Sequence, residues 1–89
     1  MPALVIPRRF KSRLHKKTPA MQGAILECVS RLGVNPRHPG LNAHPVGGAH
    51  GAWEAYVDGS NRVTFEHAPD GSIVLLNHCN HDMIRRAPR

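Results

Sequence analysis

The stretch NHCNHDM at 77–83 concentrates reactive side chains near the end of the chain. It holds two imidazoles (His78 and His81), the Cys79 thiol and the Asp82 carboxylate. Such groups suit either zinc binding or acid–base catalysis. Structural zinc needs four convergent ligands, usually in paired spacings, and the sequence has no CxxC pair. Neighbouring residues on a strand also point to opposite faces, which separates His78 from Cys79. We therefore expect no metal and no cofactor, and we weigh acid–base chemistry against solvated polar residues at a strand end.

The composition predicts one small basic domain. The chain has 89 residues, with 12 Lys and Arg against 6 Asp and Glu, for a formal charge of +6. We expect a single domain over 1–84 and a flexible basic tail over 85–89. The excess charge favours anionic partners, either nucleic acid or an acidic protein segment. Two cysteines make no disulfide framework, and no apolar run is long enough for a signal or membrane span, so a cytoplasmic location without membrane partners is expected.

Apolar spacing predicts two helices after a short strand at 3–6. The first helix covers 8–17 and is crowded with Lys and Arg, while Phe10 and Leu14 share one face. Thr18 followed by Pro19 is typical of a helix start. The second helix then presents one apolar stripe, in which we expect Cys28 to be a core residue, and Gly33 is expected to cap its end in the left-handed conformation.

The second half of the sequence predicts a hairpin-rich sheet. A Pro- and Gly-rich loop over 35–52, with an edge strand at 41–46, precedes strands at 53–58, 62–66 and 72–79. We expect an α+β fold in which the two N-terminal helices cover one face of a small curved, mainly antiparallel sheet. The last strand is apolar on both faces, which favours an internal position.

Hairpin registers predict which side chains meet on the uncovered face. A three-residue loop at 59–61 places Val57 opposite Val63, and this leaves Glu54 opposite Glu66. A turn at 69–71 sets a register in which Phe65 pairs with Leu75. Further along the same two strands, this register places Arg62 opposite His78. The uncovered face is then expected to carry the following side chains: Glu54, Tyr56, Arg62, Thr64 and His78.

The order of these elements, together with the motifs HPVGG.HG.WEAYV and RVTF and a terminal apolar strand ending near a histidine, resembles the RelE/ParE toxins of bacterial toxin–antitoxin pairs. The resemblance covers about residues 3–84 of the chain. It implies a RelE-like fold. The same fold serves ribosome-dependent messenger-RNA cleavers and inhibitors of DNA gyrase, so fold alone does not fix activity.

The resemblance to the RNA-cleaving members implies roles for particular residues. A histidine beyond the last strand matches His81, and an arginine opening the preceding strand matches Arg62. One subgroup has a histidine before the central hairpin, matching His44, and another where this chain has Tyr56. Those relatives often carry an aromatic residue soon after the His81 position, whereas this chain has "MI" at 83–84.

The chemistry implied is metal-independent cleavage of RNA through its own 2′-OH. Histidine suits the proton transfers and arginine suits the phosphate. We expect a translation-inhibiting endoribonuclease that acts on messenger RNA at the ribosome and is neutralised by an antitoxin with an acidic segment. The alternatives are a non-nucleolytic gyrase inhibitor and an inactive basic module that binds RNA or a partner. The candidate RNA- or antitoxin-binding residues are Lys11, Arg13, Lys16, Lys17, Arg37, His78, Arg85 and Arg86.

Overall fold

A computed structural model of the chain describes residues 2–47 and 51–83, without the side chain of His81. Within these residues one sheet has the strand order β1-β5-β4-β3-β2, with β1 parallel to β5 and the other pairs antiparallel. The predicted α+β fold with an internal last strand is confirmed. The elements are β1 (Leu4–Val5), α1 (Arg8–Leu14), α2 (Pro19–Val34), η1 (Pro39–Leu41), β2 (His44–Pro45), β3 (Trp53–Tyr56), β4 (Asn61–His67), β5 (Ile73–Asn80) and η2 (His81–Met83).

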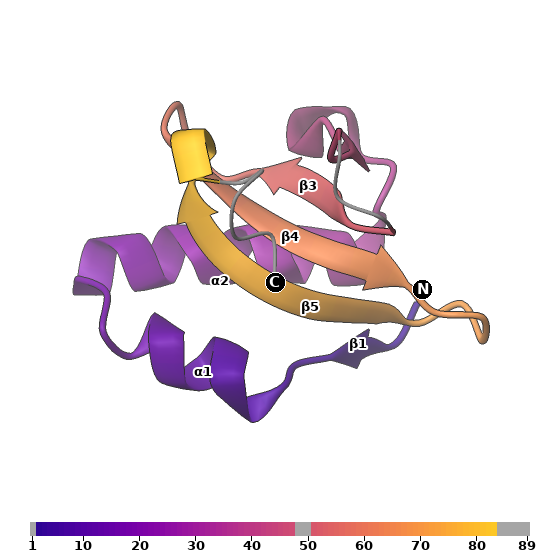
Figure 1. The fold of residues 1–89 in the computed structure, drawn as a ribbon, viewed down its shortest axis with the longest axis horizontal. Helices are drawn as coiled ribbons and strands as arrows, with labels where there is room; N and C mark the ends of the chain where they lie inside the picture. Colours follow the sequence, from indigo (N-terminus) through magenta and orange to yellow (C-terminus); the bar gives the residue numbers. More distant parts are fainter. Residues whose placement is uncertain (1, 48–50, 84–89) are drawn as a thin grey trace.

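Both helices pack against the same face of the curved sheet, and they share its hydrophobic core (Figure 1). Phe10 and Leu14 of α1 and the apolar stripe of α2 meet the inward residues of β3, β4 and β5. Phe65, at the centre of β4, is completely buried. No helix in the described ranges is both long and apolar enough to cross a membrane.

The second helix begins as predicted and ends differently. The Thr18 hydroxyl accepts a hydrogen bond from the Met21 N–H, which caps the first turn. Cys28 is buried in the core as expected, and burial raises the pKa of its thiol to about 12. Gly33 is not a left-handed cap, because it lies inside the helix. A Cβ there would lie 2.9 Å from Leu4 Cδ1, so glycine lets α2 approach β1 closely.

The predicted register of the β3–β4 hairpin is wrong by two residues. Tyr56 pairs with Arg62 and Glu54 pairs with Thr64. The cause is Asp58, whose carboxylate accepts hydrogen bonds at 2.9 Å from the backbone N–H groups of Ser60 and Asn61. These bonds hold Asp58 in the loop and lengthen it. A shift of two preserves which face each side chain occupies.

The predicted β4–β5 register holds on one side of a bulge and fails on the other. Phe65 pairs with Leu75 as predicted, but Thr64 pairs with Asn77, so Leu76 is an extra residue in β5. Beyond this bulge, Arg62 lies opposite Cys79 and not opposite His78. One inserted residue exchanges the faces of the side chains that follow. His78 is therefore opposite Val63, on the face covered by helices.

His78 is a buried contact between β5 and α1. Its residue is 5 % exposed, its Nε2 lies 3.3 Å from the Phe10 carbonyl oxygen, and its ring meets the Phe10 ring edge-on at 4.8 Å. Burial lowers the pKa of His78 below its ordinary value, an effect that the bond to the Phe10 carbonyl opposes and that the positive charges of Lys17 and Arg13 reinforce. A neutral ring that donates from Nε2 suits this position.

This burial predicts a pH-dependent stability. The unfolded chain binds the His78 proton more tightly than the folded protein does, so its contribution is complete above the unfolded pKa of about 6.5 and declines as the pH falls below that value. In urea unfolding near pH 7.5 and pH 5, His78→Leu should show a smaller difference in unfolding free energy between the two pH values than the unsubstituted protein. His15→Gln, at an exposed histidine, is the control and should keep the full difference. An unchanged difference in His78→Leu would contradict the assignment.

Candidate functional site

The face of the sheet without helices gathers four polar side chains from β2, β3 and β4. Along β3, Glu54 and Tyr56 alternate with the core residues and so point away from the helices. His44 on β2 lies opposite Glu54, and Arg62 on β4 lies opposite Tyr56. We call His44, Glu54, Tyr56 and Arg62 the Glu54 cluster. Three of its members were predicted site residues, and the structure brings these three together.

Glu54 is the member that sequence reasoning missed. It is 6 % exposed, and its Oε1 lies 3.1 Å from His44 Nε2 and 3.7 Å from Arg62 Nε. Desolvation disfavours the charge of a buried carboxylate, and the nearby guanidinium of Arg62 offsets part of that cost. The register that was wrong by two placed Glu54 opposite Glu66. A register chosen to bring opposite charges together would have placed Glu54 near Arg62.

Arg62 is held on three sides. Its Nη1 donates to the carbonyl oxygens of Asp58 at 2.6 Å and Asn61 at 2.9 Å, and its Cζ lies 4.9 Å from the centroid of the Tyr56 ring. Arg62 thus bonds the carbonyl of Asp58 and not its carboxylate, which accepts hydrogen bonds from the backbone of Ser60 and Asn61. Both protons of Nη1 are engaged, so a phosphate would be bound through Nε and Nη2.

His44, on the edge strand β2, contacts both the backbone before that strand and the buried carboxylate of Glu54. Its Nδ1 lies 2.7 Å from the Asn42 carbonyl oxygen, while its Nε2 faces Glu54. A carbonyl oxygen only accepts hydrogen bonds, so Nδ1 of His44 donates to it, and Nε2 is the nitrogen that faces the Glu54 carboxylate. The side chain is half exposed. The arrangement thus places an imidazole beside a buried carboxylate at the surface.

Tyr56 and Cys79 border the cluster. Tyr56 is 42 % exposed, and the guanidinium of Arg62 lies over its ring in a cation–π contact. Cys79 lies opposite Arg62. Burial raises the pKa of the Cys79 thiol, the negative charge of Glu54 raises it further, and Lys17 and Arg13 oppose the rise. The thiol therefore stays protonated at neutral pH and is a poor nucleophile.

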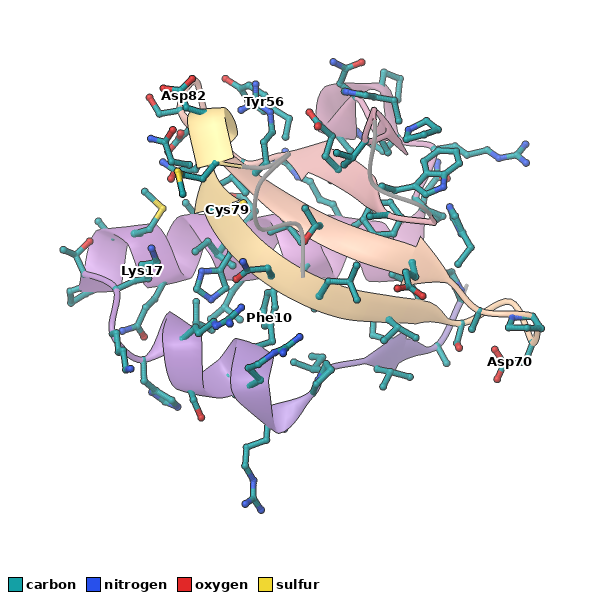
Figure 2. All side chains as sticks on the ribbon, viewed as in Figure 1. Phe10, Lys17, Tyr56, Asp70, Cys79 and Asp82 are labelled. Carbon is teal, nitrogen blue, oxygen red and sulfur yellow. The ribbon has the colours of Figure 1, made fainter. Side chains whose placement is uncertain are left out.

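The position of His81 follows from the chain on either side. Asn80 pairs with Asn61 at the end of the β4–β5 ladder, and His81 begins η2 directly afterwards. Its backbone therefore lies one residue beyond the pair that adjoins Arg62, while its side chain lies outside what the structure describes. Figure 2 shows Tyr56 and Asp82 at the same end of the sheet, with Asp70 at the opposite end.

The uncovered face is less polar than predicted. Thr64 is fully buried, and its hydroxyl donates to the Asn77 carbonyl oxygen. A second apolar cluster, formed by Val46 and Ala52 with Leu76 and Cys79 packed against them, covers part of this face. Among the described residues, no three His, Cys, Asp or Glu side chains converge to hold a metal ion. Val46 and Ala52 thus shield part of this face, and the Glu54 cluster lies nearer the β2 edge of the sheet.

The predicted binding residues fall into separate groups. Lys11, Lys16 and Lys17 are exposed on α1 and the turn after it, and Arg13 is partly buried beside them. Arg37 is exposed in the loop after α2. His78 is buried under α1 and therefore lies outside the proposed binding surface. Arg85 and Arg86 lie outside the described residues.

The fold of the chain is that of the RelE/ParE toxins of toxin–antitoxin systems, as solved structures show. The RelBE2 toxin–antitoxin complex of Mycobacterium tuberculosis superposes with a TM-score of 0.71 at 19% identity, covering 91% of this chain and 100% of that one. The RelE–RelB complex of Pyrococcus horikoshii gives 0.70 at 18% identity, with 89% and 93% covered. The isolated RelE toxin of E. coli gives 0.67 at 8% identity, with 90% and 84% covered. No family model matches the chain, and no curated protein matches it in sequence.

Burial predicts that the Glu54–Arg62 pair is more strongly coupled than a shorter ion pair elsewhere. Glu27 and Arg31 approach to 2.7 Å, but their side chains are 64% and 51% exposed, whereas those of Glu54 and Arg62 are 8% and 15% exposed at 3.7 Å. A double-mutant cycle with Glu54→Gln and Arg62→Gln should give a coupling of about 1 kcal/mol or more. The matched cycle with Glu27→Gln and Arg31→Gln should give about 0.3–0.5 kcal/mol. A larger coupling energy for the exposed pair would show that the distance between the charges, and not their desolvation, determines the strength of the coupling.

Proposed function

We propose that the protein is the toxin of a toxin–antitoxin pair and that it cleaves messenger RNA at the ribosome. The observation that carries this proposal is the convergence of His44, Tyr56 and Arg62 around Glu54, at the end of the sheet where β5 leads into His81. The RelE/ParE fold supports the toxin assignment, and the cluster supports an RNA-cleaving activity within that fold.

The proposed reaction uses the nucleophile of the RNA itself. His81 removes the proton from a 2′-OH, and the resulting oxygen attacks the adjacent phosphorus. The P–O5′ bond breaks and the departing 5′ oxygen takes a proton, for which the half-exposed imidazole of His44 is the proposed donor. The products are a 2′,3′-cyclic phosphate and a 5′-OH, and none of the proposed steps uses a metal. Each proton transfer by a positioned group is typically worth about 10²–10⁴-fold in rate.

Arg62 and Tyr56 are proposed to serve the phosphate and its surroundings. The guanidinium stabilises the charge that accumulates on the pentavalent phosphorus, and its orientation is fixed before substrate arrives. Tyr56 keeps Arg62 in place and offers an exposed aromatic edge beside the scissile phosphate. Tyr56 is the one tyrosine of the sequence, and no aromatic residue follows His81. We therefore propose that Tyr56 supplies the aromatic side chain of the site.

Two kinds of partner are proposed. Lys11, Lys16 and Lys17 form an exposed basic surface that suits ribosomal RNA phosphates or the acidic segment of an antitoxin. Antitoxin binding is supported by the structural neighbours from M. tuberculosis and P. horikoshii, which are both toxin–antitoxin complexes. Neutralisation would follow if the antitoxin covered this surface together with the Glu54 cluster.

One observation favours the second candidate, a non-nucleolytic inhibitor of DNA gyrase. The carboxylate of Glu54 is buried beside Arg62 and opposes the approach of a phosphate to that guanidinium. Cleavage must therefore be tested directly.

Expression of the protein in cells, followed by mapping of messenger-RNA 5′ ends, tests the proposal. We expect growth arrest with new cleavage sites within translated frames. Both His81→Ala and Arg62→Ala should remove these sites, because a loss of about 10²-fold or more in rate would take cleavage below detection.

The control variants change the same residue types elsewhere. His15→Ala and Arg31→Ala alter exposed residues in the helical layer and should leave the cleavage sites unchanged. Circular dichroism of each variant confirms folding. Growth arrest with intact messenger RNA would contradict the nuclease proposal and support the gyrase candidate. Growth arrest that persists in both site variants would lead to the same conclusion.

A further inference from the structure

A separate cavity lies near the opposite end of the β3–β4 hairpin. It has a volume of about 560 Å³ and is lined by the loop after α2, by Trp53 and by His67. Trp53 and Glu54 are neighbours on β3 and point to opposite faces. The cavity therefore lies on the other side of the sheet from the Glu54 cluster, and its volume falls within the range of sites that bind small ligands.

The floor of the cavity is aromatic. Trp53 packs on the edge of the core next to Phe65, with ring centroids 6.3 Å apart. The exposed His67 ring meets the Trp53 ring at 89° with centroids 4.8 Å apart. These contacts hold the indole in one position while part of it remains accessible. A rigid, partly exposed indole is a surface on which a planar base can stack.

The rim of the cavity is positive and can donate hydrogen bonds. Arg37 is exposed at this rim, and none of the described lining residues carries a carboxylate. His38 accepts the Gly40 N–H through Nδ1 at 3.0 Å, so the proton of its neutral ring lies on Nε2. Arginine and an imidazole N–H beside an aromatic floor match a phosphate attached to a base.

The cavity is connected to the Glu54 cluster around the β2 edge. Asn42 lines the cavity, and its carbonyl oxygen bonds Nδ1 of His44. Asn42 takes a left-handed conformation, with φ of 45°, between η1 and β2. A strand of RNA that crossed this edge would thus pass directly from the cavity to His44.

We propose that this cavity binds one unpaired nucleotide of a single-stranded RNA, with its base on Trp53 and its phosphate at Arg37. The choice of RNA as ligand rests on the proposed function, whereas binding in the cavity does not require cleavage. The site extends substrate recognition to a nucleotide away from the scissile bond. An acidic peptide segment would satisfy Arg37 but would leave the aromatic floor without a stacking partner.

Trp53 is the sole tryptophan of the sequence, so its fluorescence reports on this cavity. The probe is a 2′-O-methyl oligonucleotide of about ten nucleotides, within the span of typical single-strand sites, which cannot be cleaved through its 2′ oxygen. Titration into the full chain should quench Trp53 saturably. The slope of log affinity against log salt should fall by about 0.7 in Arg37→Gln, because one phosphate contact is lost.

Arg31→Gln removes the same charge from α2, outside this cavity, and should keep the original salt slope. Absence of saturable quenching, or equal slopes in the two variants, would overturn the proposal. Equal quenching by an acidic decapeptide would also overturn it and place a protein segment in the cavity. Messenger-RNA cleavage without Trp53 quenching would overturn this site alone, and quenching without cleavage would overturn the nuclease alone.

Discussion

The extra residue in β5 is the constraint on which the placement of the candidate site depends. Before the bulge, Ile73 and Leu75 face the helices, and strict alternation would have sent Cys79 to the same side. After Leu76 the faces exchange, so His78 enters the core and Cys79 lies beside Arg62. The exchange gives α1 a polar anchor, since the His78 ring reaches the Phe10 carbonyl. It also removes one imidazole from the surface near His81, which separates the two histidines of NHCNHDM in position.

Burial of Glu54 gives the cluster its order. An ion pair that is largely removed from water gains strength from the lower local dielectric but must offset its own desolvation, so it favours one arrangement of its members over others. Glu54 approaches His44 and Arg62 from the same oxygen, Oε1, which ties the edge strand β2 to the central strand β4. Two separate strands are thereby kept in the register that brings their functional groups together.

The fold was predictable because periodicity and turn chemistry are local signals. The sequence predicted the Thr18-Pro19 helix start, the apolar stripe containing Cys28 and the turn at 69–71. Gly71 in that turn has a positive φ of 89°, as the predicted turn requires. The registers were less predictable. A side chain can bond to backbone inside a loop, as Asp58 does, and an inserted residue can sit anywhere in an apolar run such as IVLL. Glu54 was missed for this reason, because its partners are set by register and not by neighbours in sequence.

The surroundings of Arg62 suit an arginine better than a lysine. One nitrogen serves two carbonyl oxygens, another lies near a carboxylate, and Cζ lies 4.9 Å over the centroid of the Tyr56 ring. A lysine ammonium has a similar charge but lacks both the fork and the plane. The two carbonyls belong to Asp58 and Asn61, so the loop that shifted the hairpin register also orients the guanidinium. The backbone of this loop therefore both joins β3 to β4 and fixes the position of the Arg62 guanidinium. A phosphate bound at this edge would meet a positive charge that is already oriented.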